Sequence, residues 1–160
     1  MATPTNLPAS QTTGNVLTAA YVNDLRGAFR ILQVISDPNT TPQSTSSGTF
    51  ADTAYSITIT PQSTSSKIFC VFSSSVYQPS GGTGAGIRLM RGATAIAGQS
   101  GLANSSAQSV VGVSLSFLDS PSTTSATTYK IQLHRFEGTG SLTLDVNNGT
   151  GCLTVFEISA

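Results

Sequence analysis

The run Val111-Gly112-Val113-Ser114-Leu115-Ser116-Phe117 alternates apolar residues with glycine or serine, the cleanest period of two in the chain. Successive side chains of a β-strand point to opposite faces, so this pattern predicts a strand with one face in a core and the other in solvent. The alternation recurs on both sides of this run, at residues 55–59, 129–133 and 142–146. The chain is therefore predicted to be mainly β.

Two further runs are apolar without alternation, at residues 68–72 and 152–156. Strands of this kind are typical of a sheet position that is covered on both sides. With turn signals such as Pro61 and Asn148-Gly149 between them, seven or eight strands at a spacing of about 10–15 residues indicate an antiparallel β-sandwich over residues 49–160. A final strand that is apolar on both faces favours a central position in the sheet, as in a jelly roll.

The N-terminal part of the chain lacks this strand pattern. Residues 1–15 contain Pro4 and Pro8 and no charge, which predicts an extended arm. Thr18 is a candidate N-cap for a helix over about residues 19–34, within a helical unit at 16–36. Residues 37–48, rich in serine, threonine and proline, are predicted to link this helix to the sandwich.

The predicted helix has one apolar stripe, formed by Val22, Leu25, Phe29 and Leu32. One interpretation is that the stripe packs against the domain that follows. The other is that it associates with the stripes of neighbouring copies, and we assign these four residues to oligomerisation or attachment. Two heptads are too short to associate strongly alone, so such a bundle would need a larger interface elsewhere.

The composition restricts the partners of the protein. The 160 residues include 24 serines and 23 threonines, but only seven basic and seven acidic residues, and the net charge is zero. A neutral surface gives no electrostatic basis for binding nucleic acid or an anionic membrane. No apolar run is long enough for a membrane span, and the first 15 residues do not resemble a signal peptide.

The residues that could support catalysis are few and scattered. Cys70 and Cys152 lie in strand-like runs and are predicted to be buried thiols in preference to a disulfide. His134, the one histidine, is predicted to be an exposed strand residue beside Lys130 and Gln132. The glycines of residues 81–86 are not followed by a Lys-Ser/Thr pair and suggest a flexible loop. We therefore expect no catalytic, cofactor or metal site.

Several phrases resemble small virion proteins of aquatic tailed bacteriophages. They are the opening Ala2-Thr3-Pro4-Thr5-Asn6-Leu7-Pro8, the helical stretch at 17–30, and Ser116-Phe117-Leu118-Asp119-Ser120-Pro121 with the following residues 128–132. The resemblance implies a virion component and a trimeric jelly roll, as in capsid cement proteins and fibre tips. It also implies a place on the virion surface after assembly in the host bacterial cytoplasm.

We expect a capsid cement or decoration protein that forms homotrimers on the head and contacts the major capsid protein or other virion proteins. The alternative is a tail-fibre or receptor-binding tip that uses the loops at residues 81–86 and 104–106. The head is favoured because about 16 helical residues provide no shaft, whereas an uncharged arm suits contact with a shell. A polysaccharide depolymerase is the third hypothesis, and loss of polymer viscosity would support it.

Overall fold

The structure is a computed structural model that describes residues 18, 31–79, 83–105, 107–145 and 149–159, with the backbone alone at 83 and 99–105. Within these residues the secondary structure is β-strand, and no helix occurs. The strands are β1 (Ile31–Asn39), β2 (Gln43–Thr45), β3 (Ala51–Ile59), β4 (Lys67–Gln78), β5 (Thr83–Arg91), β6 (Thr94–Ser105), β7 (Ser109–Asp119), β8 (Thr127–Glu137), β9 (Leu142–Leu144) and β10 (Gly151–Ile158).

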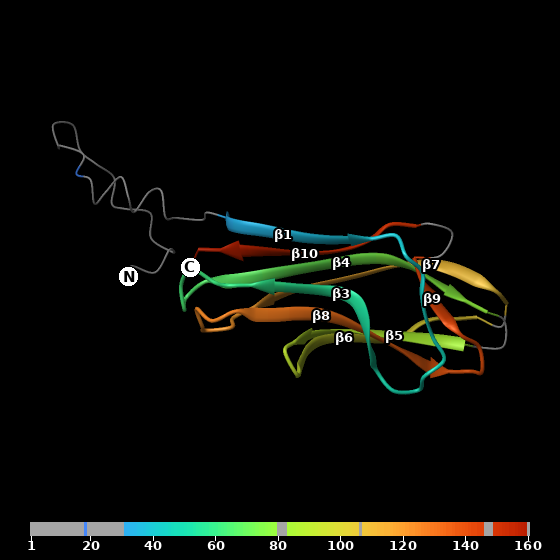
Figure 1. Ribbon diagram of the computed structural model, residues 1–160. Helices are drawn as coiled ribbons and strands as arrows, with labels where there is room; N and C mark the ends of the chain where they lie inside the picture. Colours follow the sequence, from blue (N-terminus) through green and yellow to red (C-terminus); the bar gives the residue numbers. More distant parts are fainter. Residues whose placement is uncertain (1–17, 19–30, 80–82, 106, 146–148, 160) are drawn as a thin grey trace, which may run out of the picture.

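The strands form two antiparallel sheets that face each other (Figure 1). Sheet B has the order β3-β8-β5-β6, and the other six strands form sheet A. In sheet A, β10 and β9 lie end to end along one edge of β4, because β10 pairs with residues 67–73 and β9 with Val76 and Tyr77. Outside them, β1 pairs with β10 and β2 with β9, while β7 pairs with the opposite edge of β4.

This topology is that of a jelly roll. Counting β1 with β2 and β9 with β10 as single positions gives eight strands, in the orders 1-8-3-6 and 2-7-4-5. Among these eight positions, only the connection from β5 to β6 stays within one sheet, and every other connection crosses between the sheets. The prediction of a jelly-roll-type sandwich is confirmed, and the last strand does lie inside its sheet, between β1 and β4.

The core lies between the sheets and is built by the alternating side chains that the sequence pattern predicted. In β10, for example, Leu153 and Val155 are fully buried, while their neighbours Thr154 and Phe156 lie on the outer face and are partly exposed. The large side chains with almost no exposure are Tyr55, Phe72, Tyr129, Ile59, Ile68, Ile87, Leu89, Ile131, Leu142, Leu144 and Leu153. Burial of this apolar surface is the main force that holds the two sheets together.

A buried carboxylate, Asp145, directly follows β9 and lies beside the start of β10. Asp145 is fully buried with a positive φ of 59°, and its carboxylate accepts hydrogen bonds from the hydroxyls of Tyr55 (2.5 Å) and Ser74 (2.7 Å). A Cβ at Gly151 would collide with the Tyr55 hydroxyl oxygen and the Asp145 carboxylate. Only glycine therefore fits where β10 begins beside this buried group.

The sequence-based boundaries near the N-terminus are wrong where the structure tests them. The predicted helix over 19–34 ends in residues that belong to β1, and the predicted linker over 37–48 contains the end of β1 and the whole of β2. The sandwich thus begins at Ile31 instead of residue 49. The apolar residues at 31, 32, 34 and 35 are compatible with both a helical stripe and a strand. The segment is a strand because it pairs with β10. Residues 1–17 and 19–30 lie outside the described part.

Both cysteines are free, as predicted, but they differ in burial. Cys70 is 1% exposed, and burial raises the pKa of its thiol to about 12, which keeps it protonated and unreactive. Cys152 is only partly buried and points to the outer face of sheet A, where its Sγ lies 3.2 Å from the Ser36 hydroxyl. Among the described residues, no helix has the length and hydropathy of a membrane span.

Candidate functional site

The outer face of sheet A carries a row of large apolar side chains that nothing in the described chain covers. Direct strand partners place Val34 of β1 beside Phe156 of β10, Phe156 beside Phe69 of β4, and Phe69 beside Leu118 of β7. The row therefore crosses all four strands at this end of the sheet. Val34 is 51% exposed and Leu118 is 53% exposed, and the two phenylalanine rings lie 6.2 Å apart between their centroids.

Three neighbours widen this row into a continuous surface. Ile31 and Ile158 are strand partners next to it, and Val71 lies on the same face of β4. A groove of about 390 Å³ runs among these side chains, lined by Ile31, Phe69, Val71, Thr154, Phe156 and Ile158. We call this surface the apolar band, formed by Ile31, Val34, Phe69, Val71, Leu118, Phe156 and Ile158.

The band explains the two runs that lacked alternation. β4 and β10 are apolar on both faces, which predicted cover on both sides. The structure buries one face of each strand against sheet B and leaves the other partly exposed. Contiguous exposed apolar surface on a soluble domain marks an interaction site, since leaving it in water is unfavourable. The second cover is thus expected from outside the described residues.

The margin of the band on the side of Ser36 and Thr154 is uncharged. Beyond the row lie the hydroxyls of Ser36 and Thr154, which are hydrogen bonded to each other at 2.7 Å. At the opposite margin Lys67 donates to the Ser120 hydroxyl at 2.8 Å. A partner that covers the band would therefore desolvate apolar atoms and already paired hydroxyls, with little charge to bury.

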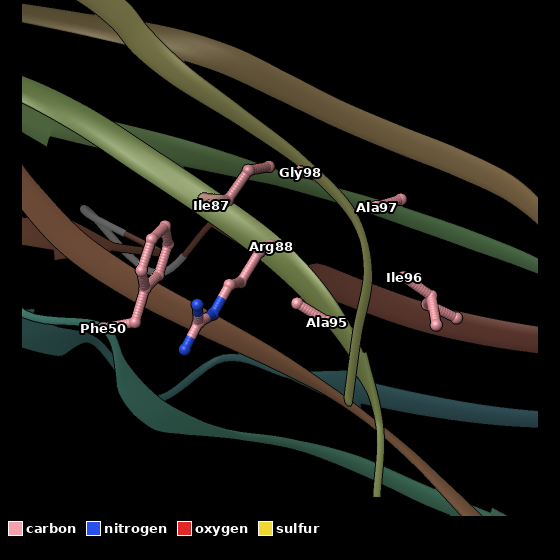
Figure 2. A pocket seen from close by; sticks show the side chains of 7 residues that line it. All are labelled: Phe50, Ile87, Arg88, Ala95, Ile96, Ala97 and Gly98. Carbon is pink, nitrogen blue, oxygen red and sulfur yellow. The ribbon is translucent and has the colours of Figure 1, made fainter. Parts of the chain in front are cut away.

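The outer face of sheet B holds a second candidate site of different chemistry (Figure 2). The guanidinium of Arg88 lies over the Phe50 ring, 4.0 Å from its centroid, beside a groove of about 350 Å³ formed with residues 95–98 of β6. The Arg88 Nε donates to Gln132 at 2.7 Å. An arginine positioned in this way could bind an anionic group with its remaining N–H donors.

His134 lies beneath the same ring. His134 lies on the same face of β8 as Gln132, as predicted. It is only 9% exposed, because the Phe50 ring stacks on it with 3.9 Å between ring centroids. The prediction of an exposed histidine is therefore wrong. The ring that covers it comes from the residue just before β3, far away in sequence, so strand alternation could not reveal it. The His134 Nε2 atom has no hydrogen-bond partner in the described chain.

A polar chain extends from this cluster along sheet B. Asp52 accepts hydrogen bonds from Gln132 at 2.5 Å and from Lys130 at 2.6 Å, and the latter is also an ion pair. Hydrogen bonding from Lys130, then from Gln132, lowers the pKa of Asp52 below its usual value. The carboxylate stays charged, and it holds Gln132 in place for Arg88.

Asp119 is a buried carboxylate with structural partners. Asp119 accepts from the Tyr129 hydroxyl at 2.6 Å and pairs with Arg91 at 2.8 Å. Burial, with a further contribution from Asp119, raises the pKa of Tyr129, so this hydroxyl remains a donor. No group of three or more potential metal ligands occurs in the part of the chain that the structure describes.

The residues assigned to oligomerisation from the sequence are only partly placed. Leu32 lies in β1, at an irregularity of its pairing with β10, and is partly buried, so it does not extend a helical stripe. Val22, Leu25 and Phe29 lie outside the described residues. Of the two loops assigned to receptor contact, residues 84–86 are buried within β5, and residues 104 and 105 belong to β6. Sequence reasoning did not single out the band, although the two-faced runs of β4 and β10 pointed to it.

No protein-family model matches the chain, and a search of curated proteins found no match. Solved structures with a similar arrangement include the infectious bursal disease virus Gx strain, with 13% identity and a TM-score of 0.41 over 81% of this chain. T=1 particles derived from that virus match with 12% identity and a TM-score of 0.40 over 80% of this chain. Its VP2 subviral particle matches with 11% identity and a TM-score of 0.37 over 79% of this chain. The match spans 33–39% of the length of those chains. Likeness at this level does not define a function.

Proposed function

We propose that this protein is a structural component of a virion, and that it forms homotrimers that decorate the capsid surface of a tailed bacteriophage as a cement protein. The observation that carries the proposal is the apolar band, an exposed apolar surface suited to assembly in a chain with no net charge. The sequence phrases that resemble phage virion proteins support the same assignment, as does the jelly roll, a fold common in viral capsid domains.

The proposed role is mechanical and not catalytic. A cement protein adds contact area where shell subunits meet, and each apolar square ångström removed from water contributes about 25 cal/mol. The band supplies such area within the trimer. The uncharged residues 1–15 would lie along neighbouring shell subunits, because an uncharged segment loses little hydration there. The partners are other copies of the chain and the major capsid protein.

The test has two parts. Equilibrium sedimentation of the full chain should show a trimer at micromolar concentration, and a stable monomer would contradict the proposal. A variant lacking residues 1–15 should remain a folded trimer but no longer decorate particles, as measured by the amount that cosediments with purified virions.

A receptor-binding tip of the tail is the second candidate, and the Phe50–Arg88 groove is the observation that favours it. The two candidates differ in where the protein lies. Gold-labelled antibody should be spread over the head in many copies if the protein is a cement, whereas labelling confined to the tail would decide for the tip.

A further inference from the structure

We propose that the apolar band is covered by residues 19–30 of a neighbouring copy, whose apolar positions Val22, Leu25 and Phe29 pack on it. This inference rests on the proposed trimer and names the contact that would hold it together. It combines the described surface of sheet A with the sequence of the segment that precedes it.

The first argument is position. β1 begins at Ile31, which is 54% exposed and is itself a member of the band. The 30 residues before it therefore enter the domain at the edge of the uncovered surface. They include the apolar helical stripe that the sequence predicts, and an apolar stripe and an apolar sheet face each need a cover.

The second argument is size. Three strand spacings of about 4.8 Å separate β1 from β7, so the row from Val34 to Leu118 is about 14 Å wide. At 1.5 Å per residue, a helix places Val22 and Phe29 about 10 Å apart along its axis. A single short helix laid across the strands is thus long enough for its stripe to contact most of the row.

The third argument decides between the chain's own band and that of a neighbour. A layer packed on a sheet lies about 10 Å above it, so about three extended residues are needed to connect β1 in the sheet to a helix in that layer. If the helix covered the band of its own chain, residues 28–30 would have to form this extended connection. Phe29 would then lie outside the helix and could not pack on the band with Val22 and Leu25. On a neighbouring copy all three apolar positions are available.

The test uses disulfide cross-linking in the full chain. Cys152 lies on the outer face and is changed to serine, while the buried Cys70 is retained. Into this background we would introduce Leu25→Cys with Leu118→Cys, and as a matched control Leu25→Cys with Val110→Cys. Val110 and Leu118 lie on the same face of β7 with 52% and 53% exposure, about 26 Å apart along the strand.

After mild oxidation, the Leu118 variant should run as chains linked to one another on a non-reducing gel, at least about tenfold more than the Val110 variant. A disulfide within single chains would overturn the proposal in favour of cover by the same copy. Equal linking in both variants, or none in a chain that sediments as a trimer, would also overturn it. A chain that sediments as a monomer would instead remove the proposed trimer itself.

A second variant needs no cysteine. Leu25→Asp with Phe29→Asp, in the otherwise natural chain, should raise the dissociation constant of the trimer at least about thirtyfold while the sandwich stays folded by circular dichroism. A trimer of natural strength in this variant would overturn the proposal, because charged side chains could not pack on the band.

Discussion

The two outer faces of the sandwich carry apolar rings in different settings. On sheet B, Phe50 is held between Arg88 and His134, and polar groups continue the surface through Gln132 and Asp52. On sheet A, aromatic and aliphatic side chains contact one another across four strands, with hydroxyls at one margin and Lys67 at the other.

This difference assigns the faces different roles. The Phe50–Arg88 cluster on sheet B already has partners within the domain, so its side chains are held in place without a neighbour. On sheet A the partners are missing from the described chain, and an assembly would supply them. Hydroxyl side chains keep much of the remaining surface of sheet A polar with few charges, which would limit repulsion between copies in an assembly.

The largest effect should come from adding charge to the band. Phe156→Asp together with Leu118→Asp should weaken trimer formation by at least about 3 kcal/mol, because association would bury unpaired carboxylates. Sedimentation equilibrium measures the change. The control is Phe136→Asp on sheet B, where the replaced ring is 52% exposed. Equal weakening by the control would remove the distinction between the faces.

The next effect concerns the buried acid at the end of sheet A. The Glu157 carboxylate accepts from Gln33 at 2.6 Å and from the Gln62 amide at 2.7 Å. Burial alone would raise the pKa of Glu157, but the hydrogen bonds it accepts outweigh burial and lower it from 4.5. Glu157→Gln should reduce the free energy of unfolding by about 2 kcal/mol at pH 7, measured by urea denaturation.

The sign of the pH dependence follows from that lowered pKa. The stabilisation by ionised Glu157 is fully present above its unfolded pKa, near 4.5, and is lost as the pH falls through the folded value. The natural chain should therefore lose stability on acidification below about pH 4.5, and Glu157→Gln should lose less. Parallel curves for the two proteins would show that another group is responsible.

A smaller effect is expected for the ring on sheet B. Phe50→Ala should uncover His134 and remove the cation-π contact of Arg88, at a cost of about 1 kcal/mol in unfolding free energy. Trimer formation should not change. Calorimetry gives the first quantity and sedimentation the second, and a loss of trimer would show that sheet B also takes part in assembly.

The smallest effect belongs to the exposed ion pair. Asp52→Asn should change the unfolding free energy by less than about 0.5 kcal/mol, because water screens the contact with Lys130. The comparison with Glu157→Gln then separates a buried acid under the band from an exposed acid on sheet B. A loss as large as that of Glu157→Gln would mean that the polar chain of sheet B is a structural element in its own right.

The sequence by itself determined that the domain is a β-sandwich of the jelly-roll type. Alternation as at residues 111–117 is local information, because successive strand side chains point to opposite faces whatever the strand pairs with. The apolar character of β10 also predicted its interior place in the sheet. These features needed no knowledge of which residues meet.

Only the tertiary structure decided what depends on distant pairing. Residues 31–34 fit a helix or a strand by periodicity, and β10, more than 120 residues away in the chain, selected the strand. His134 is buried because Phe50 crosses over it. The band exists because the register of four strands aligns one apolar residue from each. A local sequence pattern cannot distinguish an apolar face that the domain covers from one that a partner would cover.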